Sequence, residues 1–162
     1  MATETEGFLA EMLPRQRAAE QAIHNGDVEP RLALWTRTDP VTVFGAKMSG
    51  SGWADVESMF RQVASWFSDS AKYEFEVIAA GASGDLAYTV GYEHNRVKVD
   101  GQPRTYTLRV THVYRRENGQ WRIVHRHADV PAAEGERSEE PGRAVDETFV
   151  VRARRDLDAQ RF

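Results

Sequence analysis

Two histidines near the end of the patterned part of the chain, His125 and His127, stand two positions apart in a strand-like segment. Successive side chains of a β-strand point to opposite faces, so both imidazoles lie on one face. Imidazole titrates near neutral pH, which suits the pair to general acid–base catalysis. The alternative is structural: one or both histidines are buried and hydrogen-bonded to neighbouring groups.

The face that carries these histidines also carries bulky apolar side chains. Strict alternation puts Trp121, Ile123 and Asp129 on it. Because large apolar residues are mostly buried, we expect this face to point inward. His125 and His127 would then reach the interior, and Asp129 would lie at the strand end, where a carboxylate can also be solvated.

A turn at Asn118-Gly119 predicts a hairpin between strands at 104–116 and 121–129. The length of this turn decides which residues of the first strand face inward, because a slip of one residue exchanges the two faces. A two-residue turn places His112 opposite His125.

A three-residue loop that includes Glu117 gives the other register. Thr111 then lies opposite His125, and Arg109 lies opposite His127. An inward guanidinium must be paired or bind an anion, so Arg109 would hold a carboxylate, enolate or phenolate, or form an ion pair within the protein.

The two-residue register permits a metal site. His112 would join His125 and His127 as three nitrogen ligands, a set that suits zinc or iron. His94 is a possible fourth ligand, although nothing in the sequence fixes its face. We keep this site as an alternative and expect no bound metal.

The elements that position these residues follow from hydrophobic periodicity. Apolar residues recur at three and four positions in the first part of the chain and at two positions after residue 72, which predicts helices followed by strands. This order is typical of an α+β domain with an antiparallel sheet. We predict helices at 3–24, 28–37 and 53–68, and strands at 41–44, 73–80, 86–99, 104–116 and 121–129.

The periodic pattern ends near residue 130, so we predict an α+β domain at 1–130 and a charged tail at 131–162. The tail begins with a stretch rich in Gly, Pro, Ser and charges, which is typical of a linker. A short β-like run follows at 148–151. This tail is either a solvated appendage or an arm that docks on the domain or on a second subunit.

Composition narrows the classes of function. The chain has 162 residues, a formal net charge of −4 and no cysteine. It therefore lacks a basic surface for nucleic acid or membranes, and it lacks disulfides and zinc–thiolate sites. No apolar stretch is long enough to cross a bilayer, and the first residues do not form a secretion signal. We expect a cytoplasmic protein.

Two segments carry a resemblance to a known family. The segment Ile23-His24-Asn25-Gly26-Asp27 and the hairpin from Arg109 to His127, in this helix-then-sheet order, resemble the SnoaL-like families of the nuclear-transport-factor-two-like superfamily. They are also similar to the association domain of calcium/calmodulin-dependent protein kinase II. The resemblance implies a cone-shaped, cystatin-like α+β fold: a strongly curved antiparallel sheet wraps the N-terminal helices and leaves a pocket. It also implies homodimers through the outer sheet face.

The same resemblance favours one hairpin register. Relatives place a polar residue at the Thr111 position in the pocket, and a dimer through the outer face needs apolar residues such as Val110 and Tyr114 outside. We therefore favour the three-residue loop. Matching by resemblance also puts Glu93 on the inward face with Asn95 beside it.

Relatives include ketosteroid isomerase-like and polyketide cyclase-like proteins, dehydratases and assembly domains. The resemblance thus implies a cofactor-free acid–base enzyme, of isomerase, dehydratase or cyclase type, that acts on a small, mostly apolar molecule. Arg109 would stabilise negative charge, and His127 or Glu93 would move the proton. The residues that would shape the pocket are Trp53, which follows a Gly-rich loop at the start of a helix, together with Asn95, Thr111 and His125.

Two alternatives remain open. The domain would bind a ligand or assemble into dimers without catalysis, or it would be a metal enzyme that uses His112, His125 and His127.

Overall fold

The computed structural model describes residues 1–132; residues 133–162, which include the predicted β-like run at 148–151, lie outside the described part. Three helices and two short strands precede four long strands. Their bounds are α1 Glu4–Ile23, α2 Glu29–Leu34, β1 Thr42–Phe44, β2 Ser49–Ser51, α3 Trp53–Ala64, β3 Phe67–Ser83, β4 Leu86–Val99, β5 Gln102–Glu117 and β6 Gln120–Asp129.

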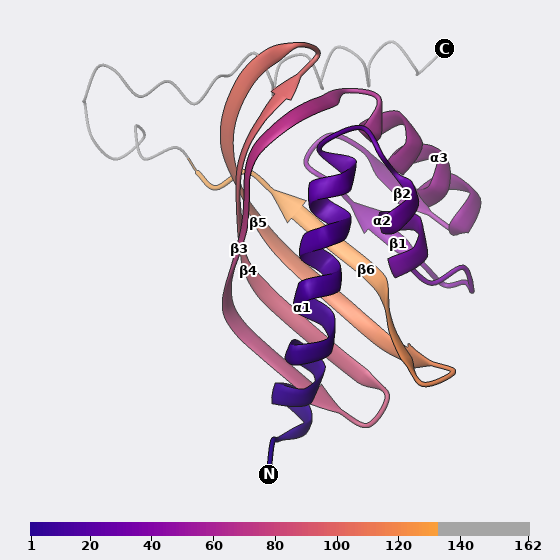
Figure 1. The fold of residues 1–162 in the computed structure, drawn as a ribbon. Helices are drawn as coiled ribbons and strands as arrows, with labels where there is room; N and C mark the ends of the chain where they lie inside the picture. Colours follow the sequence, from indigo (N-terminus) through magenta and orange to yellow (C-terminus); the bar gives the residue numbers. More distant parts are fainter. Residues whose placement is uncertain (133–162) are drawn as a thin grey trace.

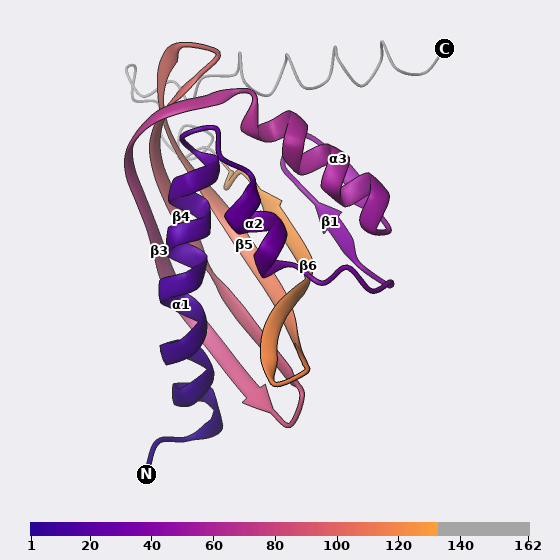
Figure 2. The same ribbon diagram turned by 45° about the vertical axis from the view of Figure 1, so that its right-hand side comes forward.

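The six strands form one curved sheet in the order β2-β1-β6-β5-β4-β3. Figures 1 and 2 show the long strands bending around α1, with α2 and α3 on the same side. This confirms the predicted class, with N-terminal helices inside a strongly curved sheet. The sheet is mixed rather than wholly antiparallel, because β1 runs parallel to β6.

Helix α1 begins with a capping box. The Thr3 hydroxyl accepts from the Glu6 backbone at 3.1 Å, and the Glu6 carboxylate accepts from the Thr3 backbone at 2.7 Å. The kink or new start predicted at Pro14 is wrong, since the helix continues through it. Pro14 and Ala10 are exposed, so water can satisfy the carbonyl that Pro14 leaves without a donor. Among residues 1–132, no helix combines the length and apolar character needed to cross a membrane.

The core lies between α1 and the concave face of the sheet. Phe8 makes edge-to-face contacts with Tyr114, at 4.8 Å between ring centroids, and with Trp121, at 5.2 Å. All three rings are at most 1% exposed. Each aromatic contact adds about 0.5–1.5 kcal/mol to the burial of these side chains.

Helix α3 is shorter than the predicted 53–68. It ends at Ala64, and Phe67 already pairs with Val99 of β4. The Trp66 carbonyl accepts from the Asp100 backbone at 2.8 Å. Sheet pairing therefore takes over the backbone groups that one more helical turn would use, although Trp66 and Phe67 fit the helical periodicity.

The hairpin between β5 and β6 has a two-residue turn, so the favoured three-residue loop is wrong. Glu117 pairs with Gln120, and the register holds as far as Tyr114 opposite Ile123. The next pair is Val113 with His125. Val124 thus has no partner on β5 and forms a β-bulge.

The bulge exchanges the two faces of β6 at its midpoint. Trp121 and Ile123 point inward before it, as predicted. Beyond it the buried residues are Arg126 and Ala128, while His125 and His127 face the other side. Strict alternation fails here because the extra residue shifts the pattern by one position.

On β5 the inner face is the one that the two-residue turn requires. Val110, His112 and Tyr114 are at most 2% exposed. Arg109 and Thr111 therefore point outward, which contradicts the prediction that both line the interior.

We predict that Gly91→Ala lowers the free energy of unfolding by about 2–3 kcal/mol, because β3 approaches β4 too closely for a side chain there. A Cβ on Gly91 would lie 2.2 Å from the Glu76 carbonyl oxygen and 2.8 Å from the Phe75 ring. Gly7→Ala is the control: this exposed α1 site has no neighbour within 4 Å, so the change should stabilise by about 0.5–1 kcal/mol. Urea unfolding measures both, and equal stabilities would contradict the packing argument.

Candidate functional site

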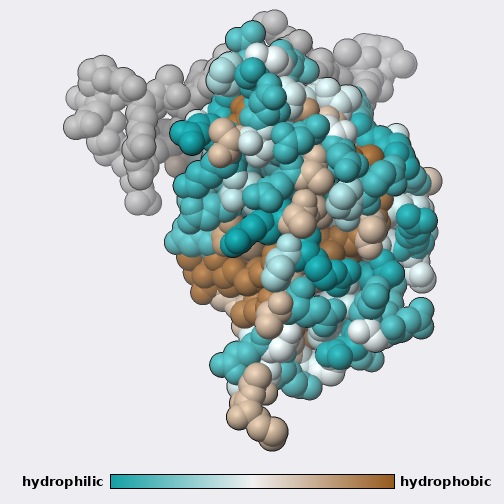
Figure 3. Space-filling model, viewed as in Figure 1, coloured by the Kyte–Doolittle hydropathy of each residue, from teal (hydrophilic) through white to brown (hydrophobic). Residues whose placement is uncertain are grey.

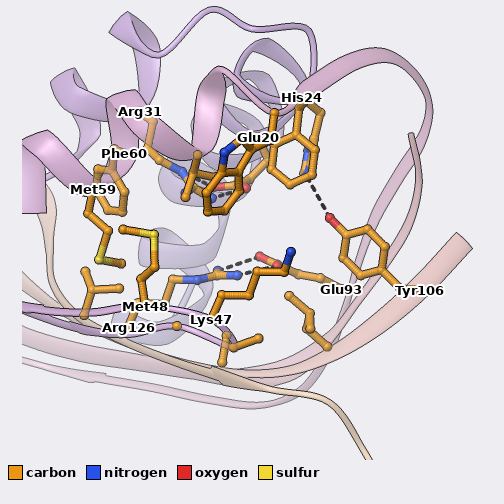
Figure 4. Close-up of a pocket in the computed structure, with 18 residues that line it drawn as sticks. Glu20, His24, Arg31, Lys47, Met48, Met59, Phe60, Glu93, Tyr106 and Arg126 are labelled. Carbon is orange, nitrogen blue, oxygen red and sulfur yellow. Dashed lines mark hydrogen bonds and ion pairs between the residues drawn. The ribbon is translucent and has the colours of Figure 1, made fainter. Parts of the chain in front are cut away.

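A pocket of about 100 Å³ opens between the concave face of the sheet and the helices. Its walls are mainly apolar, and its polar groups come from α1 and its C-cap, α2, the β1–β2 connection, β4, β5 and β6 (Figure 4). The apolar lining includes Val43, Ala46, Met48, Met59, Phe60, Val63, Trp66, Phe67, Leu108 and Ala128.

Two ion pairs lie on opposite sides of this pocket (Figure 4). Arg31 donates from Nε and Nη2 to the two carboxylate oxygens of Glu20, at 3.0 and 2.5 Å. Arg126 donates from Nη1 and Nη2 to those of Glu93, at 2.8 and 2.7 Å. All four residues are buried, so each carboxylate offsets the charge of its arginine.

Glu93 has the inward position that the resemblance implied. Burial alone would raise its pKa, but the charge and hydrogen bonds of Arg126 outweigh burial and lower the pKa to about 2. Tyr73 also donates its hydroxyl to Glu93, at 3.1 Å. Glu93 is therefore a carboxylate at neutral pH and holds Arg126 in place.

His24 and Tyr106 form a third polar group at the pocket. His24 Nε2 lies 3.4 Å from the Tyr106 hydroxyl oxygen (Figure 4). Burial lowers the pKa of His24 and raises the pKa of Tyr106, so both side chains are neutral near pH 7. His24 Nδ1 is buried and has no hydrogen-bond partner within residues 1–132.

Glu20 and His24, the polar pocket residues from α1 and its C-cap, were not among the predicted site residues. Glu20 lies on the buried stripe of α1, and His24 continues it at the C-cap. Together with Met12 and Gln16 they recur at a spacing of four, so one helix face changes from apolar to polar. Buried polar residues on an apolar stripe are the signal that could have revealed the site.

Strict alternation from Ile123 would place Arg126 on the outer face of the sheet. The bulge at Val124 brings it inside. There its Nη1 also contacts His112 Nε2 at 3.1 Å. Because arginine only donates, His112 accepts on Nε2 and carries its proton on Nδ1.

The structure does not bring Arg109, Thr111 and His127 into this pocket. They line a shallow hollow of the outer face, where Arg109 forms a two-point ion pair with Asp129 at 2.8 and 2.6 Å. The side chain of Arg109 is 54% exposed. Its prediction as an inward anion-binding residue is therefore wrong in position, as is that of His127.

The three-histidine arrangement is not assembled. His112 lies on the inner face, whereas His125 and His127 lie outside, beside Phe44. His125 Nδ1 is 2.7 Å from the Thr42 hydroxyl, so this histidine joins β1 to β6. Within residues 1–132 no group of His, Asp and Glu is arranged to hold a metal ion.

Two further predicted pocket residues lie nearby but outside the lining. Trp53 begins α3, where its backbone donates to Asp39 at 3.0 Å and its ring lies under Arg37. Asn95 is buried on the inner face, as the resemblance implied, and pairs with Tyr106 in the sheet. It lines a separate hollow, together with Lys72 and Thr105.

Comparisons with known proteins agree with this fold. The family model for the SnoaL-like domain matches residues 16–133. No curated protein matches the chain.

Three solved structures share the fold. A ketosteroid isomerase-like protein from Erwinia carotovora atroseptica is 18% identical with a TM-score of 0.61, covering 77% of this chain and 97% of that one. A proposed dehydratase of the nuclear transport factor 2-like family from Streptomyces avermitilis is 19% identical with a TM-score of 0.63, covering 78% and 98%. A proposed calcium/calmodulin-dependent protein kinase type II association domain from Thiobacillus denitrificans is 20% identical with a TM-score of 0.60, covering 75% and 95%.

We predict that stability falls as pH drops from about 6.5 to about 5. Burial lowers the pKa of His24 and of His112 in the folded state, so the unfolded chain binds protons that the folded chain refuses. Each such histidine adds a slope of about 1.4 kcal/mol per pH unit. Urea unfolding across this range should show a shallower slope of stability against pH for His112→Gln than for the parent. Identical slopes for His112→Gln and the parent would contradict the assignment.

Proposed function

The chain belongs to the SnoaL-like family, and on this basis we propose that its pocket binds a small, mostly apolar molecule and transfers a proton on it without a cofactor. Isomerisation, dehydration and cyclisation are reactions of this type. The observation that carries the proposal is His24, a neutral buried imidazole at the wall of an apolar pocket. The ketosteroid isomerase-like and dehydratase neighbours in fold support the same class of reaction.

His24 is the proposed base. A neutral imidazole can accept a proton, and burial keeps His24 neutral by lowering its pKa. In this role the Nε2–H of His24 donates to the Tyr106 hydroxyl oxygen, which orients the ring and leaves the lone pair on Nδ1, an atom without a partner in residues 1–132, to accept the proton. The Tyr106 hydroxyl stays protonated, because burial raises its pKa, and can serve as a hydrogen-bond donor.

Arg126 takes the role that the sequence analysis gave to Arg109. When a proton leaves a carbon next to a carbonyl, negative charge develops on the oxygen, and a fixed cation in a water-poor pocket stabilises it. Arg126 lines the pocket and is held on two sides, by Glu93 and by His112. A donor fixed in advance needs little reorganisation as the charge forms.

Glu93 acts through Arg126 in this proposal. A carboxyl group with a pKa of about 2 is a weak base and holds no proton to donate near neutrality. We therefore assign Glu93 as a positioning residue rather than as the group that moves the proton.

The homodimer through the outer sheet face remains a proposal. Apolar side chains on the outer side of β3 and β4 support it: Leu86 and Ile78 are more than half exposed, and Tyr88 and Val90 follow on the same face of β4. In Figure 3, apolar surface gathers at the lower left, over the region where β3 and β4 run in Figure 1. Such a patch is typical of an interaction surface.

We predict that the protein accelerates deuterium uptake next to the carbonyl group of small single-ring ketones in D₂O, as followed by NMR. His24→Asn should slow this exchange by about 10²-fold or more, because it removes the base. Because burial lowers the pKa of His24, the rate should hold as pH falls to the ordinary histidine value of about 6.5 and should decline only below it.

Two comparisons test the assignment. His94→Asn, on the outer side of β4, is the matched control and should exchange as fast as the parent. A loss confined to His127→Asn would contradict His24 as the base and return that role to the outer face. If His24→Asn leaves the rate of deuterium exchange unchanged, this would also contradict His24 as the base.

We predict that the parent protein is a dimer in light scattering and that Val90→Glu makes it a monomer, because a charge in the centre of the patch must be desolvated on association. Ser58→Glu, on the exposed side of α3, should leave the dimer intact. A parent protein that is monomeric at micromolar concentration would contradict the outer-face dimer.

A further inference from the structure

Arg126 retains an unused pair of hydrogen-bond donors. A guanidinium carries five N–H groups. Three of those on Arg126 are used: Nη1 donates to Glu93 and to His112, and Nη2 donates to Glu93. The Nε–H and one N–H of Nη2 remain, and within residues 1–132 no contact occupies them.

The two remaining donors lie on one edge of the guanidinium. They point in nearly the same direction, at a spacing that matches the two oxygens of a carboxylate. The other arginine of the pocket shows this edge in use, because Arg31 binds Glu20 through Nε and Nη2. Glu93 binds Arg126 through Nη1 and Nη2 instead, which leaves the Nε–Nη2 edge open.

We propose that the pocket ligand carries a carboxylate, and that this group binds the Nε–Nη2 edge of Arg126. The inference rests on the proposed function only in taking the pocket as a ligand site. It names a chemical class: a small monocarboxylate with an apolar body. The carboxylate occupies the open edge and leaves the pairing of Arg126 with Glu93 and His112 unchanged.

The charges and walls of the pocket fit this class. The guanidinium groups of Arg31 and Arg126 balance the carboxylates of Glu20 and Glu93, and Lys47 also lines the pocket. An added carboxylate therefore meets no excess of negative charge among these four residues.

The rest of the lining sets the ligand's size and polarity. The apolar wall includes Met48, Met59, Phe60 and Trp66, which suit a hydrocarbon chain or a single ring. A volume of about 100 Å³ favours a body no larger than one ring. Methionine side chains adapt their shape, so they can close around such a body.

Calorimetry with the full chain tests the proposal, using benzoate and its neutral isostere benzamide as probes. Benzoate should bind at least about tenfold more tightly than benzamide, because only benzoate supplies two charged oxygens. Equal affinities would overturn the carboxylate inference while keeping a ligand pocket. Absence of binding by both probes would overturn it too.

Two variants separate recognition from folding. Arg126→Lys keeps the charge but loses the two-donor edge, and should weaken benzoate by about tenfold or more with little change for benzamide. Glu93→Gln removes a nearby negative charge at almost constant shape and should tighten benzoate, which a variant damaged in folding would not do. Glu74→Gln, an exposed control, should bind as the parent does. Weaker benzoate binding by folded Glu93→Gln would overturn the proposal.

The outcomes also distinguish this inference from proton transfer. Benzoate binding without deuterium exchange would support the carboxylate edge and contradict His24 as a base. Deuterium exchange on neutral ketones, with equal binding of benzoate and benzamide, would support His24 as the base and contradict the carboxylate site.

Discussion

The ion pair between Arg126 and Glu93 is the constraint on which the rest of the pocket depends. A buried charge without a partner costs several kcal/mol. The strands that carry the pair, β4 for Glu93 and β6 for Arg126, must therefore place the two side chains within hydrogen-bonding distance of each other. β4 and β6 are not neighbours in the sheet, because β5 lies between them. The pair therefore fixes the curvature and register of three strands together, and His112 on the middle strand fills the space next to it.

The helices carry a second buried ion pair on the opposite wall of the pocket. The buried stripe of α1 ends in polar residues, and Glu20 takes its partner Arg31 from α2. Between the two ion pairs lies a space that apolar side chains surround but do not fill. The pocket thus follows from the way the core is built: charges that must pair on two opposite walls hold the walls apart. Stability and ligand binding depend on the same residues.

Much of the fold could be predicted from the sequence, whereas of the pocket's charged residues only the inward Glu93 was predicted. The spacing of apolar residues changes from helical to strand-like near residue 72, and this specifies the order of the elements. The Asn118-Gly119 turn specifies the last hairpin. Residues 121–127 fit a regular strand in which side chains alternate between the two faces. No feature of the neighbouring sequence indicates that Val124 lacks a partner. The bulge is favoured by long-range partners: Thr36 donates to the Ile123 carbonyl at 3.0 Å, and β1 pairs with β6 from His125 onward. Such partners are visible only once the chain is folded.

The unpaired Val124 also bears on how this fold can change its chemistry. A shift of one position beyond the bulge moves every later side chain of β6 to the opposite face, so the strand holds two alternative sets of functional groups. One set, Arg126 with Ala128, now faces the pocket; the other, His125 with His127, faces away. If Val124 paired with Val113 and the bulge were absent, His125 and His127 would replace Arg126 and Ala128 on the pocket face without a change in any amino acid. The register of this half of the strand, as much as its composition, thus decides which functional groups the pocket holds.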